Sequence, residues 1–216
     1  MTQTDGLPGL PDLPDLPVVE VLEEVRAALA VHGRAILGPP PGAGKTTIVP
    51  IALASAACLD GQRLVMLEPR RLATRAAAQR MAALLGERVG ETVGYQTRDE
   101  RVIGPQTRIE VVTEGVLTRR MQRDPALAGY GAVIFDEVHE RNLPTDLGLA
   151  FVGDVRAVLR PDLRVLAMTA TPDTKGLLRV LGDGAPVIAA EGRLHPVEIV
   201  YAPPAPRERP AEAMAA

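Results

Sequence analysis

The sequence predicts an α/β fold in which a mostly parallel sheet is flanked by helices. Short apolar strands alternate with helical segments along most of the chain. Of the 216 residues, 46% are hydrophobic but only 2% are aromatic, so the core must consist of Leu, Val, Ile and Ala. Such a core suits a parallel sheet that is buried on both faces, and alternating strands and helices imply crossovers between parallel strands. The length suffices for one domain with a full core.

The predicted elements follow one another in a regular order. A leader, residues 1–17, repeats Leu-Pro, and a first helix spans 18–31. The predicted strands are 35–37, 64–67, 92–96, 108–113, 132–135, 165–168, 187–188 and 197–201. The predicted helices between them are 45–57, 71–85, 114–122, 145–159 and 173–181. Residues 18–201 therefore form the predicted domain, and the Pro- and Ala-rich residues 202–216 are expected to be a linker or a truncated end.

Charge and composition limit the classes of function. The formal net charge is −3, so any nucleic-acid surface must be a local cluster of Arg residues. Lysine occurs only at positions 45 and 175. The single cysteine, Cys58, cannot form an internal disulfide, and no apolar run reaches the ~18 residues of a membrane span. A monomeric cytoplasmic protein without a membrane segment is expected.

A glycine-rich loop follows the strand 35–37 and opens the helix 45–57. Its residues are Gly42, Ala43, Gly44, Lys45, Thr46 and Thr47. Glycines let backbone N–H groups approach phosphate oxygens, the helix N-terminus adds positive potential, and Lys45 supplies a charge for the β- and γ-phosphates. The Thr46 hydroxyl is the expected Mg²⁺ ligand. Pro39 stands where the strict phosphate-loop pattern has glycine, and the alternative is a glycine-rich turn that only caps a helix.

Two adjacent carboxylates directly follow the apolar strand 132–135. Asp136 is expected to hold Mg²⁺, and Glu137 to orient or deprotonate an attacking water molecule, with both carboxylates as candidate metal ligands. The alternative is a solvated acidic loop.

With these two motifs in place, the sequence resembles the DEAH/DExH-box helicases of superfamily 2, and most closely their bacterial HrpB-like branch. Four further segments agree with that family in order and spacing: Glu68-Pro69-Arg70-Arg71-Leu72-Ala73, Gly94-Tyr95-Gln96-Thr97-Arg98, Thr113-Glu114-Gly115-Val116-Leu117 and Thr169-Ala170-Thr171. The resemblance covers about residues 18–201 and implies a P-loop NTPase domain of RecA-like fold.

The resemblance also implies roles for single residues. ATP, or another nucleoside triphosphate, would bind with Mg²⁺ at Gly42 to Thr47, with Arg80 stacking on its base. Lys45, Asp136 and Glu137 would form the catalytic group. Single-stranded RNA or DNA would be held through its backbone by Arg70, Arg71, Arg98, Thr113, Glu114 and Gly115. His139, Thr169 and Thr171 would couple the two sites. Taken singly, Arg98, Arg119 and Arg120 are each equally compatible with nucleic-acid contact and with ordinary surface charge.

The family needs a second RecA-like domain, which supplies arginine fingers, and the sequence contains no such segment. The expected function is therefore that of one motor domain of an ATP-dependent helicase, with little activity as an isolated chain. Two alternatives stay open. One is a self-contained P-loop phosphotransferase, and the other is a non-catalytic, truncated nucleic-acid-binding module.

Overall fold

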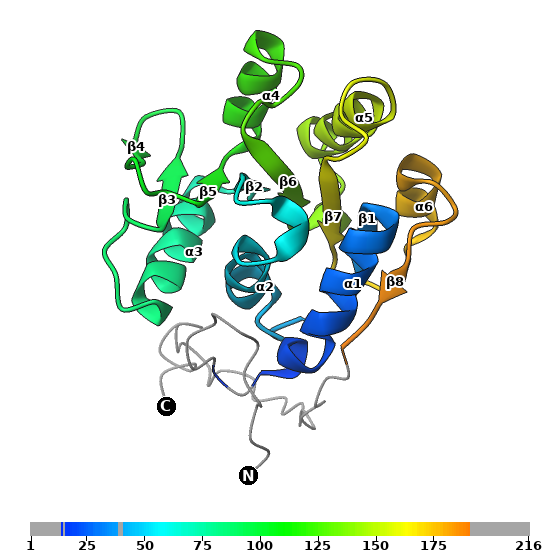
Figure 1. Cartoon of the computed structure of the whole chain (residues 1–216), viewed down its shortest axis with the longest axis horizontal. Coiled ribbons are helices and arrows are strands. Elements are labelled where there is room, and N and C mark those ends of the chain that lie inside the picture. The colour runs from blue at the N-terminus through cyan, green and yellow to red at the C-terminus, as the bar shows by residue number, and fades with distance from the viewer. Residues whose placement is uncertain (1–13, 15, 39–40, 191–216) are drawn as a thin grey trace, which may run out of the picture.

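Within the residues that the structure describes, eight strands form a single sheet in the order β4-β3-β5-β2-β6-β7-β1-β8 (Figure 1). The structure is a computed structural model that describes residues 14, 16–38 and 41–190. All strand pairs in this part of the chain are parallel except β3–β4, which is antiparallel. The strands are β1 (Arg34–Leu37), β2 (Arg63–Leu67), β3 (Val93–Gln96), β4 (Arg101–Val102), β5 (Ile109–Val112), β6 (Tyr130–Phe135), β7 (Arg164–Met168) and β8 (Val187–Ile188).

The helices lie in two layers, one on each face of the sheet (Figure 1). One layer holds η1 (Pro17–Val21), α1 (Leu22–His32), α2 (Lys45–Ala54), η2 (Ala57–Leu59) and α3 (Arg71–Leu84). The other holds α4 (Glu114–Arg123), α5 (Leu143–Val158) and α6 (Lys175–Leu181), and a short turn, η3 (Val138–Glu140), follows β6. The predicted α/β architecture with a mostly parallel sheet is therefore confirmed.

Strand side chains alternate between two hydrophobic cores. In β2, Leu64 and Met66 pack with the layer of α1–α3, whereas Val65 and Leu67 pack with the layer of α4–α6. The same alternation runs through β6 and β7. Because both faces are covered, the strands read in the sequence as continuous apolar runs.

The structure differs from the prediction in several bounds. The helix predicted at 18–31 is a 3-10 turn from Pro17 followed by α1, and the helix predicted at 45–57 ends at Ala54 before the separate turn η2. Helix α5 begins two residues early because Asn142 caps it by accepting the Thr145 N–H at 2.9 Å. The hairpin strand β4 was missed because two residues carry no periodicity. The strand predicted at 197–201 lies outside the described residues.

The register brings the carboxyl ends of the parallel strands to one edge. Leu37 of β1 pairs with Met168 of β7, and Phe135 of β6 pairs with both Ala167 of β7 and Leu67 of β2. The loops that leave β1, β7, β6 and β2 therefore emerge side by side, as expected for ligand sites in parallel sheets. Within the described ranges, no helix is long and apolar enough to cross a membrane.

Candidate active site at the carboxyl edge of the sheet

The glycine-rich loop leads directly into α2, which starts at Lys45. Gly44 caps the helix with a φ of 89°, a conformation that L-residues with a side chain rarely adopt. A Cβ at Gly44 would lie 2.6 Å from Cδ1 of Leu16. The Val18 N–H of η1 donates to the Ala43 carbonyl at 3.2 Å. The loop is thus held from outside by η1, and only glycine fits at position 44.

Lys45 connects the ends of two neighbouring strands. Its Nζ donates to the Gly38 carbonyl after β1 at 3.0 Å and to the Thr169 carbonyl after β7 at 2.5 Å. Burial lowers the pKa of Lys45, while the carboxylates of Asp136 and Glu137 act in the opposite direction. The predicted cation therefore lies at the same strand edge as the acidic pair.

Asp136 is almost completely buried, with 1% of its surface exposed. Its Oδ1 accepts the Glu137 N–H at 2.9 Å, whereas its buried Oδ2 has no hydrogen-bond partner among the described residues. Burial raises the pKa of Asp136 to about 6, and the nearby Thr46 hydroxyl is the largest opposing influence. A buried, unpartnered carboxylate oxygen beside a threonine hydroxyl suits a hard cation such as Mg²⁺.

The small number of protein oxygens available as metal ligands also fits Mg²⁺. The described part of the chain has no group of three or more His, Cys, Asp and Glu side chains that could enclose a metal ion. Mg²⁺ is usually bound through one or two protein oxygens together with substrate phosphates and water. Asp136 and Thr46 match that pattern, whereas a closed cage of protein ligands is absent from this region.

Glu137 and His139 connect the acidic pair to the segment after β7. Glu137 has a φ of 52°, a rare conformation for a residue with a side chain. The Nδ1 of His139 lies 3.3 Å from Glu137 Oε2 and accepts the Ala170 N–H at 3.2 Å. Nδ1 accepts the Ala170 N–H only when it carries no proton and donates to the Glu137 carboxylate only when it carries one, so the two contacts are alternatives.

The hydroxyls of the threonine segment after β7 contact each other. Thr169 Oγ1 and Thr171 Oγ1 are 3.2 Å apart, and the Thr171 N–H donates to Thr169 Oγ1 at 3.1 Å. Because Thr169 also contacts Lys45 and Ala170 contacts His139, this segment touches both halves of the predicted site. The three residues predicted to couple the sites, His139, Thr169 and Thr171, therefore lie together.

Glu68 is a buried carboxyl for which the sequence predicts no role in the active site. It follows β2, the neighbour of β6, and is 4% exposed. Burial, followed by the negative charge of Asp136, raises its pKa to about 8. The sequence did carry a signal for this position, since Glu68 directly follows an apolar strand just as Asp136 does. In a parallel sheet in which β2 pairs with β6, two such carboxyls lie at the same edge.

The residues predicted to contact a nucleic-acid strand lie along the same edge of the sheet, directly after β2, β3 and β5. Arg70 and Arg71 are largely exposed and pair with Glu140 and, at 2.7 Å, with Asp99. Arg98 is exposed as well.

At the end of β5, Thr113 is buried at the N-cap of α4, and Gly115 lies in the first helical turn. The Glu114 carboxylate accepts the Thr145 hydroxyl at 2.9 Å, so it already has a structural partner on α5. These positions are compatible with contact to a strand, and that role stays a prediction.

Thr47 and Arg80, the two remaining residues predicted to bind the nucleotide, lie in different places on α2 and α3. Thr47 Oγ1 lies 3.5 Å from the Gly44 carbonyl within the first turn of α2. Arg80 is exposed on α3, nine residues after the helix starts, or roughly 14 Å along its axis. The structure thus does not bring Arg80 to the strand edge where Lys45 and Asp136 meet, and its stacking role stays a prediction.

Arg120 has a structural role. Its guanidinium pairs with the buried Glu110 at 2.9 Å, and it bonds to the Tyr130 hydroxyl and to Gln96 Oε1 at 3.3 Å. Arg63 pairs with the same carboxylate at 2.7 Å, and both guanidiniums lie within 5.0 Å of the Tyr130 ring centroid. Of the three arginines left open by the sequence, Arg98, Arg119 and Arg120, the last therefore belongs to an internal charged network.

A mostly parallel sheet with a glycine-rich loop after β1 and an acidic pair after β6 defines a RecA-like α/β domain. A sequence model described as "DEAD/DEAH box helicase" matches residues 23–180. The chain belongs to this family.

Individual relatives agree with that assignment. The chain is 51% identical over 180 residues to the ATP-dependent RNA helicase HrpB of Escherichia coli (strain K12), covering 83% of this chain and 22% of HrpB. It is 35% identical over 182 residues to the ATP-dependent RNA helicase HrpA of Borreliella burgdorferi, covering 84% of this chain and 22% of HrpA. The crystal structure of the Escherichia coli DEAH/RHA helicase HrpB superimposes with a TM-score of 0.84 at 49% identity, covering 93% of this chain and 25% of that chain. The predicted family and its HrpB-like branch are confirmed, and the chain spans only a minor part of these relatives.

Proposed function

We propose that this chain is the first RecA-like motor domain of an ATP-dependent DEAH-box helicase that moves along and unwinds RNA or DNA. In this proposal the chain binds a nucleoside triphosphate at residues 42–47 and a single strand along the ends of β2, β3 and β5. Residues 18–201 would form the motor domain, and residues 202–216 would lead toward a second RecA-like domain.

The observation that carries the proposal is the set of contacts made by the segment 169–171. Lys45 donates to the Thr169 carbonyl, and the Ala170 N–H donates to His139, whose Nδ1 lies 3.3 Å from Glu137. The phosphate loop, the acidic pair and the segment after β7 therefore share direct contacts. A motor needs such coupling, because hydrolysis at one site must change contacts at another.

Each site residue then has a chemical task. Lys45 would bind the β- and γ-phosphates, and Thr46 and Asp136 would hold Mg²⁺. When bound, Mg²⁺ would neutralise charge on the phosphate oxygens. Glu137, more exposed than Asp136, would orient the attacking water and accept its proton.

The two RecA-like domains of such a helicase would enclose the nucleotide together. An arginine finger supplied from outside the domain is worth ~10³–10⁵ in rate. The chain covers 22% of the length of its curated relatives. We therefore expect the chain alone to bind nucleotide weakly and to hydrolyse it slowly or not at all.

The test is a measurement of ATP hydrolysis by this chain with and without a second RecA-like domain, each in the presence and absence of single-stranded RNA or DNA. We expect stimulation by the strand only when the second domain is present, in cis or in trans. Hydrolysis stimulated instead by a small-molecule acceptor would favour the phosphotransferase. Strand binding without any hydrolysis, even with the second domain present, would favour the non-catalytic module.

A further inference from the structure

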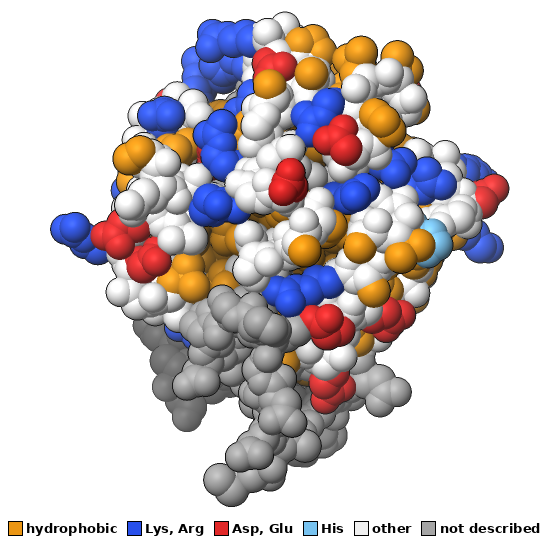
Figure 2. All heavy atoms as spheres, viewed as in Figure 1, with side chains coloured by type: hydrophobic (Ala, Val, Ile, Leu, Met, Phe, Trp, Pro, Cys, Tyr) orange, Lys and Arg blue, Asp and Glu red, His pale blue; other side chains and the backbone are white. Residues whose placement is uncertain are grey.

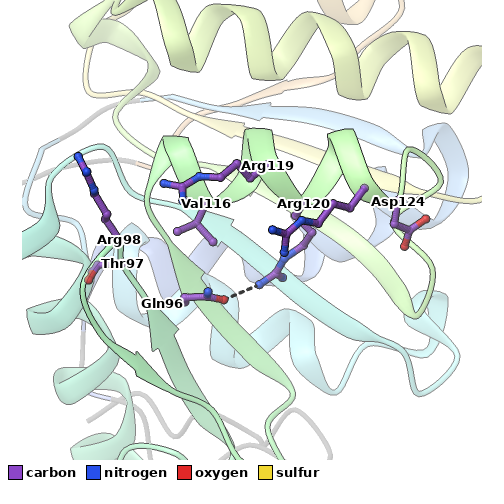
Figure 3. Close-up of a pocket in the computed structure, with 8 residues that line it drawn as sticks. Gln96, Thr97, Arg98, Val116, Arg119, Arg120 and Asp124 are labelled. Atoms are coloured by element: carbon purple, nitrogen blue, oxygen red, sulfur yellow. Dashed lines mark hydrogen bonds between the residues drawn. The ribbon is translucent and has the colours of Figure 1, made fainter.

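A basic pocket lies between the end of β3 and helix α4 (Figure 3). Its volume is about 230 Å³, and four arginines line it: Arg98 after β3, and Arg119, Arg120 and Arg123 on α4. On the face shown in Figure 2, Lys and Arg side chains gather where Figure 1 places α4 and the β3–β4 hairpin. For Arg119 the sequence leaves nucleic-acid contact and surface charge open, and for Arg123 it predicts no role.

Three of these arginines have no acidic partner among the described residues. The ion pairs of this part of the chain include Arg70, Arg71 and Arg120 but not Arg98, Arg119 or Arg123. The only acidic residue that lines the pocket is Asp124, whose carboxylate accepts the Ala128 N–H at 2.7 Å in the turn after α4. Asp124 offsets only part of the charge of these three arginines, so the pocket keeps an excess of positive charge that a bound anion would neutralise.

The side of the pocket formed by Arg120 is fixed. Its contacts with Glu110, Gln96 and the Tyr130 hydroxyl hold the guanidinium in place, and Figure 3 shows the Gln96 contact as a dashed line. Arg120 therefore shapes the pocket, whereas Arg98, Arg119 and Arg123 form no ion pair among the described residues and exceed in charge the single lining carboxylate, Asp124.

The pocket adjoins the first turn of α4. Arg119 Nε donates to the Gly115 carbonyl at 3.0 Å. Its Nη2 lies 3.8 Å from the position that a Cβ would occupy if residue 115 had a side chain. Positions 115, 119 and 123 are four residues apart, so they follow one face of the helix. A single strand of nucleic acid that contacts the N-terminal turn of α4 would next reach Arg119 and Arg123.

We propose that Arg119 and Arg123, together with Arg98, bind a backbone phosphate of the single strand next to the first turn of α4. This inference rests on the proposed function. The planar guanidinium fork matches a phosphate group, and such contacts carry no sequence information. The lining residues include no aromatic ring that could stack on a base.

The position of the pocket separates this phosphate from those of the nucleotide. Between β3 and β1, after which the phosphate loop lies, the sheet order places β5, β2, β6 and β7. Five strand spacings of about 4.8 Å correspond to roughly 24 Å. One ATP molecule bound by Lys45 cannot place its phosphates in this pocket, so a phosphate bound here would belong to a different molecule.

The experiment compares Arg119→Ala, Arg123→Ala and the double variant with the unmodified chain and with Arg88→Ala. Arg88 is the control because its side chain is 93% exposed and it lies before the amino-terminal end of β3, whereas the pocket lies after the carboxyl end of that strand. Affinity for a fluorescent oligouridylate is measured by anisotropy over a series of salt concentrations. Loss of one phosphate contact should reduce the slope of log K against log salt by about 0.7 for a single strand. Because both side chains face one phosphate, we expect the double variant to lose little more than either single variant.

The outcomes separate this site from the proposed function. If the unmodified chain and Arg88→Ala bind the strand with equal slopes, and the Arg119 and Arg123 variants match them, the pocket is not a strand site. A loss of inorganic-phosphate binding in these variants, with an unchanged strand slope, would identify a free-anion site and would also overturn the proposal. If the unmodified chain binds no strand at low salt, the nucleic-acid role itself fails, and this site fails with it. Circular dichroism of each variant shows whether a lost affinity reflects a lost fold.

Discussion

Replacing Glu68 with glutamine should change how the stability of this protein depends on pH. Glu68 is 4% exposed, and its carboxyl lies in the field of Asp136. Burial is the main cause that raises its pKa from 4.5 to about 8, and the backbone N–H of Arg70 opposes the shift. A glutamine has nearly the same shape and can still accept that N–H, but it carries no charge.

The sign of the effect follows from the direction of the shift. A carboxyl whose pKa is higher in the folded state holds its proton more tightly when folded. Its contribution to stability is complete below pH 4.5 and is lost as the pH rises through about 8. One pKa unit corresponds to about 1.4 kcal/mol, so a shift of this size corresponds to an upper limit of roughly 5 kcal/mol. Compensation by the neighbouring Asp136 will reduce the measured value.

The assay is urea unfolding of the unmodified chain and of Glu68→Gln at pH 5 and pH 8. We expect the unmodified chain to lose stability between these two values and the variant to lose less, so the variant should be the more stable protein at pH 8. Glu24→Gln, an exposed position on α1, is the matched control and should follow the unmodified chain. Parallel pH profiles for the unmodified chain and Glu68→Gln would refute the assignment of a buried, protonated carboxyl at this position.

Three further predictions concern the candidate active site. Lys45→Ala should abolish nucleotide binding measured by calorimetry, whereas Lys175→Ala, at the exposed start of α6, should leave it unchanged; equal affinities would contradict the phosphate role of Lys45. Glu137→Gln should keep nucleotide binding but stop phosphate release in the complete helicase, and surviving turnover would exclude Glu137 as the group that activates water. Because the Asp136 carboxyl has a pKa of about 6 and must lose its proton to bind Mg²⁺, the apparent Mg²⁺ affinity of the nucleotide complex should fall below that pH. Asp136→Asn should bind Mg²⁺ weakly and lack this pH dependence, and a profile that is flat down to pH 5 in the unmodified chain would contradict the assignment.

Much of the fold could be predicted because each strand is short, apolar and separated from the next by a helix. The strands 64–67, 132–135 and 165–168 were placed within two residues of their bounds, since their runs of Leu, Val, Ile and Met cannot be left in water. The errors fall where local signals are weak. The strand β4 has two residues, and the end of α2 at Ala54 is followed at once by another turn.

The sequence by itself determined the phosphate-loop motif, the acidic pair and the family, because these depend on residue types at fixed spacing along the chain. Only the tertiary structure decided which of the separated segments touch. The strand order places β7 between β1 and β6, and this order brings the Thr169 carbonyl to Lys45 and Ala170 to His139. It also places Glu68 beside Asp136, binds Arg120 into an internal network and leaves Arg119 and Arg123 facing a shared pocket. The physical reason is that charge, burial and hydrogen bonding depend on distance in space, which spacing along the chain does not specify.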